Sequence, residues 1–230
     1  MARAPRLALA GELHLVLQRG HNRQRVFTDE RDRSAYLAML ADAAVQYSVA
    51  IHAYALLDSE VHLLATPGAT ESLSRLMQSL GRRYVAAFNR RHGRSGTLWE
   101  GRFRTGLIDG VALGLDAVVH VETLPVRAGL AATAGDWPWS SAAYHLGRRR
   151  DPLVSEHPGY WTLGNTPFER ELAHARNLID GLSAAQVESF ERSVLQGHAL
   201  GSPLFCARIE RSTGRSAQAR PRGRPALNTA

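Results

Sequence analysis

Two residues with metal-binding side chains alternate in the middle of the chain. Glu60 ends the tight connection at 58–60 and His62 lies in the expected strand over residues 61–66, so the two side chains, two positions apart, can point to the same face. A carboxylate and an imidazole in this arrangement can ligate Mg²⁺ or Mn²⁺. His120 is expected near the end of a helix over residues 111–121. If the fold brings it to the pair, the three residues form a carboxylate-plus-two-histidine metal site.

A second group of candidates is a dense series of arginines with aromatic residues between them. A guanidinium group binds phosphate with two hydrogen bonds and an aromatic ring stacks on a base, so this mixture favours single-stranded nucleic acid. The alternative is a solvated helix face beside an apolar stripe, to which we assign Tyr84 and Phe88. The residues predicted to contact DNA here and in the polar turn at 19–24 are Arg19, Arg23, Arg82, Arg83, Arg90, Arg91, Arg94, Trp99, Arg102 and Arg104.

The C-terminal end carries the motif RPRGRP at residues 220–225. Prolines keep such a segment extended, and the glycine lets the backbone approach a narrow groove. Arg220, Arg222 and Arg224 would then point into the negative potential of an A·T-rich minor groove, as in the core of an AT-hook. The alternative is a basic tail that only increases solubility.

Composition limits the class of protein. The 230 residues carry a formal net charge of +7, which favours a polyanionic partner. Arginine occurs in this chain without any lysine. A GC-rich genome explains this as well as a preference for guanidinium groups, which bind phosphate with two hydrogen bonds. A single cysteine, Cys206, excludes an internal disulfide or a thiolate zinc cluster. No apolar run approaches the ~20 residues of a membrane helix, and no secretory signal is visible. We therefore expect a cytoplasmic, nucleoid-associated protein.

The hydrophobic pattern predicts an α+β fold. Period-2 segments predict strands over residues 12–18, 49–57, 61–66 and 103–108, and helical periodicity covers residues 32–46, 71–91 and 111–121. The order β-α-β-β-α-β-α indicates a ferredoxin-like antiparallel sheet with helices on one face. This unit is expected to be a DNA-binding domain over residues 1–147.

The remaining chain is predicted to be a small helical extension and a tail. An arginine run at 148–150 resembles a linker, and helices are expected over residues 168–179, 184–195 and 203–213. The last two flank a glycine-bounded turn at 197–201, so they form either a helix-turn-helix or an ordinary helical hairpin. The extension spans residues 148–214, and the basic segment 215–230 is expected to be disordered when free.

Several strings in the chain resemble those of the HUH-type tyrosine transposases, most of all the REP-associated ones. They are LHLVLQRGHNRQRVF at 13–27, AYALLDSEVHLL at 53–64, LMQSLGRRY at 76–84, FNRRHGRSGTLWEGRF at 88–103, LPVRAGL at 124–130 and WPWSS at 137–141. Because so many unusual strings occur in the right order, the resemblance over residues 12–146 is specific. The segment 197–225 is also similar to the C-terminal extension of some of these proteins.

The resemblance implies a mechanism that needs four groups. A tyrosine attacks a DNA phosphate and forms a covalent phosphotyrosine. A His-x-His strand motif, with an amide side chain one helical turn after the tyrosine, holds a divalent metal that polarises the phosphate. In this sequence His62 matches the second histidine and Glu60 stands at the first. His120 stands at the tyrosine and Leu124 at the amide. Three of the four positions differ, so the resemblance implies an impaired active site.

Two functions from different classes follow. The leading hypothesis is a DNA-binding protein of the transposase family that recognises single-stranded or hairpin DNA without strand transfer. The alternative is an active single-strand DNA transposase or nickase that uses Mg²⁺ or Mn²⁺ and an altered nucleophile, with His120 ahead of Tyr84 and Tyr144. A decaying gene copy is a third hypothesis, against which the intact apolar stripes argue. The sequence does not determine the oligomeric state.

Overall fold

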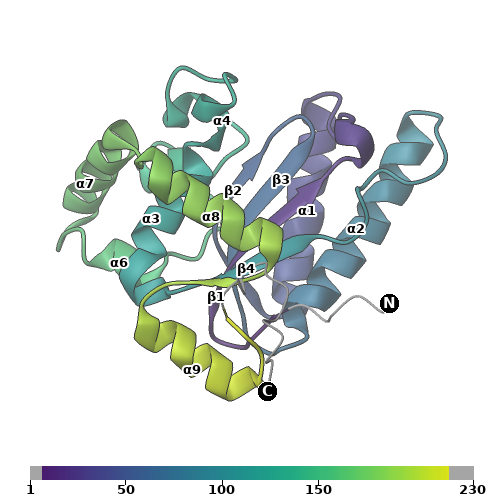
Figure 1. The fold of residues 1–230 in the computed structure, drawn as a ribbon. Coiled ribbons are helices and arrows are strands. Elements are labelled where there is room, and N and C mark those ends of the chain that lie inside the picture. The colour runs from purple at the N-terminus through teal and green to yellow at the C-terminus, as the bar shows by residue number, and fades with distance from the viewer. Residues whose placement is uncertain (1–6, 218–230) are drawn as a thin grey trace, which may run out of the picture.

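The structure, a computed structural model, describes residues 7–217. A five-stranded sheet with the order β2-β3-β1-β4-β5 lies at its centre (Figure 1). The first four strands pair in antiparallel fashion, and the short β5 pairs in parallel with β4. The strands are β1 (Leu13–Arg19), β2 (Val49–Leu56), β3 (Glu60–Pro67), β4 (Arg104–Ile108) and β5 (Ala199–Leu200).

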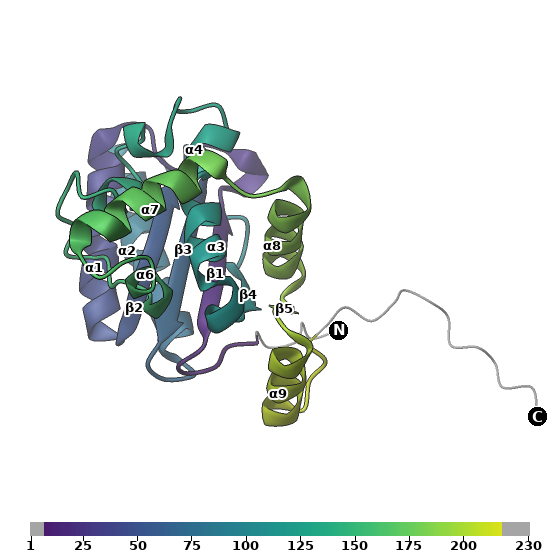
Figure 2. The same ribbon diagram turned by 90° about the vertical axis from the view of Figure 1, so that its left-hand side faces the viewer.

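Alternation along β1 divides the core between the two faces of the sheet. Val16 packs in a cluster with residues of α1 (Glu30–Gln46) and α2 (Ser72–Arg91). Leu15 and Leu17 point the other way, into a cluster with α3 (Gly110–Glu122) and α8 (Ala184–Gln196). Figure 2 shows the two helical layers on opposite sides of the strands. Any side chain on β1 or β3 can therefore be placed on a face from its position alone.

The predicted α+β class and the ferredoxin-like antiparallel sheet are confirmed, with α1 and α2 on one face. The expectation of helices on one face only was wrong. Phe190 and Val194 of α8 join α3 in covering the second face, because alternation leaves Leu15 and Leu17 to be buried there. The predicted strands and long helices all occur, with ends shifted by one or two residues.

Local capping explains where the main helices begin. The side chain of Asp29 accepts a hydrogen bond from the Asp32 amide at 3.1 Å, which starts α1 two residues before the predicted position. Asp109 caps α3 in the same way. Capping boxes start α7 (Pro167–Asp180) and α8, and Ser202 caps α9 (Pro203–Thr213). The shorter elements are η1 (His21–Arg23), α4 (Leu124–Arg127), η2 (Ala134–Asp136), α5 (Ala142–His145) and α6 (Pro158–Trp161).

The C-terminal helices are built onto the sheet. The segment 197–201, expected to be a turn, contains β5, which extends the sheet beside β4. The two flanking helices are therefore joined through a strand and not by the simple turn of a helix-turn-helix or a helical hairpin. α9 packs through Phe205, Cys206 and Ile209 against Leu107 of β4. The boundary after residue 147 stays a prediction. Within residues 7–217, no helix is both long and apolar enough to cross a membrane.

Candidate functional site

Glu60 and His62 lie on β3 and face α3 and α8, on the same side of the sheet as Leu64. The Arg19 Nε atom on β1 lies 2.8 Å from one carboxylate oxygen of Glu60. The His62 Nε2 atom lies 3.0 Å from the other oxygen. Burial alone would raise the pKa of Glu60, but His62 and Arg19 together hold it below its ordinary value. Both carboxylate oxygens are thus engaged by side chains of this chain.

His120 lies on α3 and is almost fully enclosed. Its imidazole stacks on the ring of Phe190 from α8, with the ring centroids 4.9 Å apart, and it is only 1 % exposed. Arg127 of α4 donates to its backbone carbonyl at 2.9 Å and lies 3.3 Å from Nδ1. Burial, with the nearby charges of Arg127 and His62, lowers the pKa of His120 to about 2. The side chain is therefore a neutral imidazole that solvent barely reaches.

Many of the predicted DNA-contacting arginines hold other parts of the chain together. Arg91, at the end of α2, pairs with both Asp29 and Asp32 at the start of α1. Arg83 pairs with Asp42 on α1 at 2.9 Å. Three more of the predicted arginines have a polar partner: Arg19 pairs with Glu60, Arg94 donates to Gln24 and Arg104 pairs with Glu100. These contacts give structural roles to residues whose sequence pattern indicated phosphate binding.

A smaller set of the predicted residues faces solvent. Four of the arginines predicted to contact DNA are exposed and form no ion pair within residues 7–217. They are Arg23, Arg82, Arg90 and Arg102. Trp99 is only 6 % exposed and packs edge-on against Tyr36 and at a tilt against Tyr84. It therefore offers no open ring face for stacking. Arg220, Arg222 and Arg224 lie outside the described residues.

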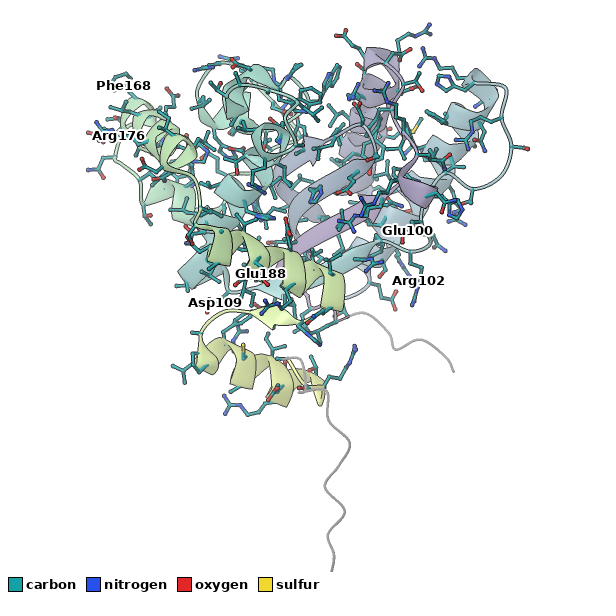
Figure 3. All side chains as sticks on the ribbon, turned by 45° about the horizontal axis from the view of Figure 1, so that its top comes forward. Glu100, Arg102, Asp109, Phe168, Arg176 and Glu188 are labelled. Atoms are coloured by element: carbon teal, nitrogen blue, oxygen red, sulfur yellow. The ribbon has the colours of Figure 1, made fainter. Side chains whose placement is uncertain are left out.

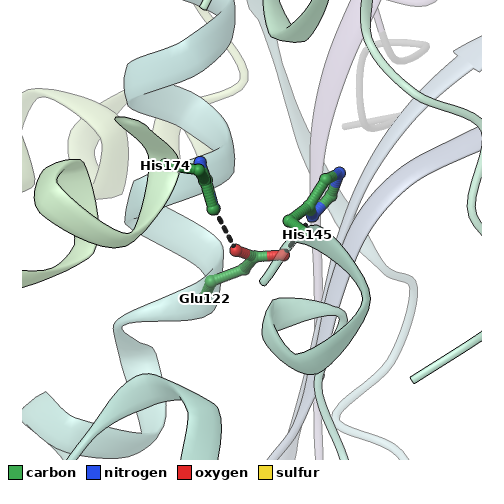
Figure 4. Close-up of side chains that lie close together, drawn as sticks. All are labelled: Glu122, His145 and His174. Atoms are coloured by element: carbon green, nitrogen blue, oxygen red, sulfur yellow. Dashed lines mark hydrogen bonds and ion pairs between the residues drawn. The ribbon is translucent and has the colours of Figure 1, made fainter. Parts of the chain in front are cut away.

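A buried ionic cluster was missed by the sequence analysis. Glu122, at the end of α3, lies between His145 of α5 and His174 of α7 (Figure 4). Its carboxylate oxygens lie 2.7 Å from His145 Nδ1 and 2.8 Å from His174 Nε2, and the Ser141 hydroxyl donates to it as well. All three ionisable side chains are 0 % exposed. Burial alone would raise the pKa of Glu122, but the two histidines outweigh burial and hold it well below its ordinary range.

Comparison with known proteins identifies the sheet-bearing part of the chain. The model of one protein family, described as "Transposase IS200 like", matches residues 10–117. This segment is similar to the IS200-like transposases. Its match contains Glu60 and His62 and ends before His120. No curated protein matches the chain.

One solved structure shares the fold of this part of the chain. A REP-associated tyrosine transposase, solved bound to a REP hairpin, has a TM-score of 0.52 at 19 % identity. The match covers 67 % of this chain and 91 % of that one. A Deinococcus radiodurans R1 protein described as a transposase has a TM-score of 0.35 at 22 % identity, with 45 % of this chain and 84 % of that chain covered.

The positions at which the resemblance implies a metal ion do not fit one in this chain. Arg19 already neutralises Glu60, so a cation would have to displace a guanidinium group. Leu124 offers no ligand atom. The predicted combination of Glu60, His62 and His120 also fails: among the residues described, only Glu122, His145 and His174 place three ligand atoms within 4.8 Å of one another.

The Glu122 cluster has the ligand types of a metal site, and its geometry favours a structural role. Metal-bound histidines usually donate their other ring N–H to a partner. Here His145 Nε2 and His174 Nδ1 are buried without a hydrogen-bond partner among residues 7–217. Sequence analysis missed the cluster because the three residues come from three separate helices in no known motif. The one available signal was a carboxylate in the apolar run of α3, which must find a partner once buried.

Adding Mn²⁺ or Mg²⁺ at about 1 mM is expected to change the melting temperature of the DNA-free protein by less than about 1 °C, because neither cluster is built for a metal. A site with a Kd of about 10 µM would instead stabilise the fold by about 2.7 kcal/mol. Thermal unfolding with each ion and with EDTA measures this. If a metal ion stabilises the protein and the effect disappears in His62→Gln, then Glu60 and His62 bind the ion in spite of Arg19. One that disappears in His174→Gln would assign a metal to the Glu122 cluster.

Proposed function

We propose that this chain is a DNA-binding protein of the transposase family that recognises hairpin or other structured single-stranded DNA without cutting it. The observation that carries the proposal is the ion pair between Arg19 and Glu60, which fills a position that the family uses for a metal ligand. Without a metal, nothing polarises the scissile phosphate.

The state of His120 supports the same conclusion. A nucleophile must reach the phosphorus atom of its substrate, and His120 is covered by Phe190 and held by Arg127. Its burial leaves no route for a DNA backbone to approach the imidazole nitrogen atoms. Retained strand transfer would require this part of α8 to move away.

DNA binding is supported by charge and by the fold. The net charge of +7 attracts a polyanion, and the exposed residues Arg23, Arg82, Arg90 and Arg102 are available to phosphates. The structure that shares the fold at a TM-score of 0.52 was solved with a REP hairpin bound. The basic motif at 220–225 supports a second proposed contact, to A·T-rich duplex, and with it an association with the nucleoid.

The test uses one labelled DNA hairpin with single-stranded flanks. On a native gel we expect a shifted complex that resists heparin competition and weakens steeply with salt. On a denaturing gel we expect neither a shortened strand nor a protein–DNA adduct, with Mg²⁺, Mn²⁺ or EDTA alike. A metal-dependent adduct or cut would establish the alternative, an active transposase or nickase, and His120→Phe would be the first variant to test. Absence of the heparin-resistant complex would refute DNA recognition.

A further inference from the structure

Helix α7 buries polar side chains and exposes apolar ones. Its two buried residues are Arg170 and His174. His174 contacts Glu122 at 2.8 Å, and Arg170 donates to the Gly164 carbonyl at 3.1 Å. A surface helix normally packs its apolar residues against the core and leaves its polar residues in solvent. In α7 this arrangement is reversed, so the apolar residues must be explained by something other than the core of this chain.

The outward side of α7 is a continuous apolar stripe. Phe168 is 72 % exposed, Leu172 45 % and Ile179 83 %. These residues lie one and then two helical turns apart, so they share one face of the helix, and Ala175 fills the gap in the stripe. Figure 1 shows α7 at the edge of the molecule, and Figure 3 shows Phe168 and Arg176 on its outer side. A contiguous exposed apolar surface usually marks a contact with another molecule.

The charges beside the stripe indicate what kind of molecule this is. Glu169, Arg176 and Asp180 are exposed along one side of it. A helix that lies on an anionic membrane carries basic residues at its rim, and a DNA phosphate would be repelled by the two carboxylates. A protein surface that carries both signs of charge is therefore the partner that this face fits.

The charges are also complementary to a second copy of the same face. Glu169 and Arg176 lie two helical turns apart on the same side of the stripe. Arg176 forms no ion pair within residues 7–217. A two-fold axis at the middle of α7 makes the second helix antiparallel and places Glu169 of each copy beside Arg176 of the other. The same rotation brings Phe168 of one copy close to Ile179 of the other.

We propose that α7 pairs two copies of this chain as an antiparallel, two-fold dimer through Phe168, Leu172 and Ile179. A helix of 14 residues is about 21 Å long, so the contact is smaller than the roughly 1,600 Å² of a standard interface. The dimer is therefore weak, with a Kd on the order of 10 µM. In Figure 1, α7 and α2 lie on opposite sides of the molecule, so pairing leaves the exposed arginines of α2 free. The inference does not depend on DNA binding.

Sedimentation velocity of the DNA-free, full-length protein from about 1 to about 200 µM tests the proposal. We expect the dimer fraction to rise with concentration. Phe168→Asp and Ile179→Lys each place a charge in the apolar contact and should raise the Kd at least about tenfold. An acidic residue is favourable near the start of a helix and a basic residue near its end. Both variants should therefore keep the circular dichroism spectrum of the native protein.

Leu204→Asp is the matched control. Leu204 is 83 % exposed and follows the proline that begins α9, as Phe168 follows the proline that begins α7. This variant should dimerise like the native protein. A chain that stays monomeric up to about 200 µM overturns the proposal, as does a dimer that survives both α7 variants or is lost in the control. If the monomer binds phosphatidylglycerol vesicles and Phe168→Asp does not, the face belongs to a membrane contact instead.

Glu169→Gln and Arg176→Gln test the antiparallel arrangement. Glu169 also accepts a hydrogen bond from the Thr166 amide at 3.0 Å, and glutamine can keep this capping box. Each substitution removes two ion pairs from the dimer and should raise the Kd about fivefold. The double variant should raise it no further than either single variant. Additive effects would contradict the pairing of Glu169 with Arg176 and, with it, the antiparallel dimer.

Discussion

Lowering the pH from about 7.5 to about 5 is expected to reduce the free energy of unfolding by about 6 kcal/mol, because three buried histidines stay neutral in the folded chain. Burial lowers the pKa of His14 to about 4 and that of His52 to about 4. Burial, Arg127 and His62 lower that of His120 to about 2. The predicted loss is a large part of the 5–15 kcal/mol typical of a folded domain.

The hydrogen bonds of His14 and His120 explain why a second proton has no place on either imidazole. The Nδ1 atom of His14 lies 2.7 Å from the Glu12 carbonyl, to which it donates, and its Nε2 accepts from the Leu9 amide at 3.3 Å. A proton on Nε2 would face another N–H group. His120 has the same conflict at Nδ1, where Arg127 points a guanidinium N–H. In both cases the environment selects one neutral tautomer.

The direction of the effect follows from the two states of the chain. A histidine in the unfolded chain binds a proton below about pH 6.5, and the folded chain does not bind it until its own lower pKa is reached. The stabilisation is therefore fully present above about pH 6.5 and is lost as the pH falls. At about pH 5 each of the three contributes a loss of about 2 kcal/mol. Ordinary carboxylates titrate below this window, at about pH 4.

Urea unfolding at about pH 7.5, 6 and 5 measures the loss and gives the proton uptake from its slope. Between pH 6 and 5 we expect the free energy of unfolding to change with pH as if unfolding took up about three protons. In His120→Phe this uptake should be about two protons. His21→Gln, at an exposed histidine, is the control and should keep the full slope. A constant free energy of unfolding down to pH 5 would show that the folded chain accommodates the imidazolium forms.

Local patterns in the sequence were enough to predict the central sheet and the long helices. Alternation in β1 and β3 and helical periodicity in α2 specify which side chains face inward, so the ferredoxin-like arrangement could be predicted. The strand β5 could not be predicted, because its two residues have no strand signal of their own and form a strand only beside β4. The second helical layer was missed for the same reason, since its position depends on which face α8 covers.

The candidate site shows a similar limit. The resemblance of the surrounding sequence assigned Glu60, His62 and His120 to the family positions, and the structure puts them on one side of the sheet. The arginine pattern was less informative, because it does not show which guanidinium groups are already neutralised. Arg91 meets Asp29, its partner 62 residues away. Such long-range pairing leaves no local periodicity in the sequence, and neither does the Glu122 cluster.

Replacing Glu122 with alanine is expected to lower the free energy of unfolding by about 3–5 kcal/mol, because a buried charged acceptor is removed and its donors stay behind. The carboxylate accepts from His145, from His174 and from the Ser141 hydroxyl. In Glu122→Ala all three donors stay buried without an acceptor, and a cavity is left between α3, α5 and α7. Urea unfolding at about pH 7.5 measures the change. Glu191→Ala, at an exposed carboxylate on α8, is the matched control and should change stability by less than about 0.5 kcal/mol.

A double-mutant cycle separates the loss of the cluster from the loss of packing volume. If the carboxylate and the imidazole stabilise each other, His174→Phe should destabilise the native protein strongly and the Glu122→Ala protein only weakly. The coupling free energy should then exceed about 1 kcal/mol, as for contacting groups in one network. Additive effects of the two substitutions would mean that Glu122 and His174 contribute only by filling space. Their 2.8 Å contact in the interior would then carry no net stabilisation, and α7 would be held in place by its apolar contacts alone.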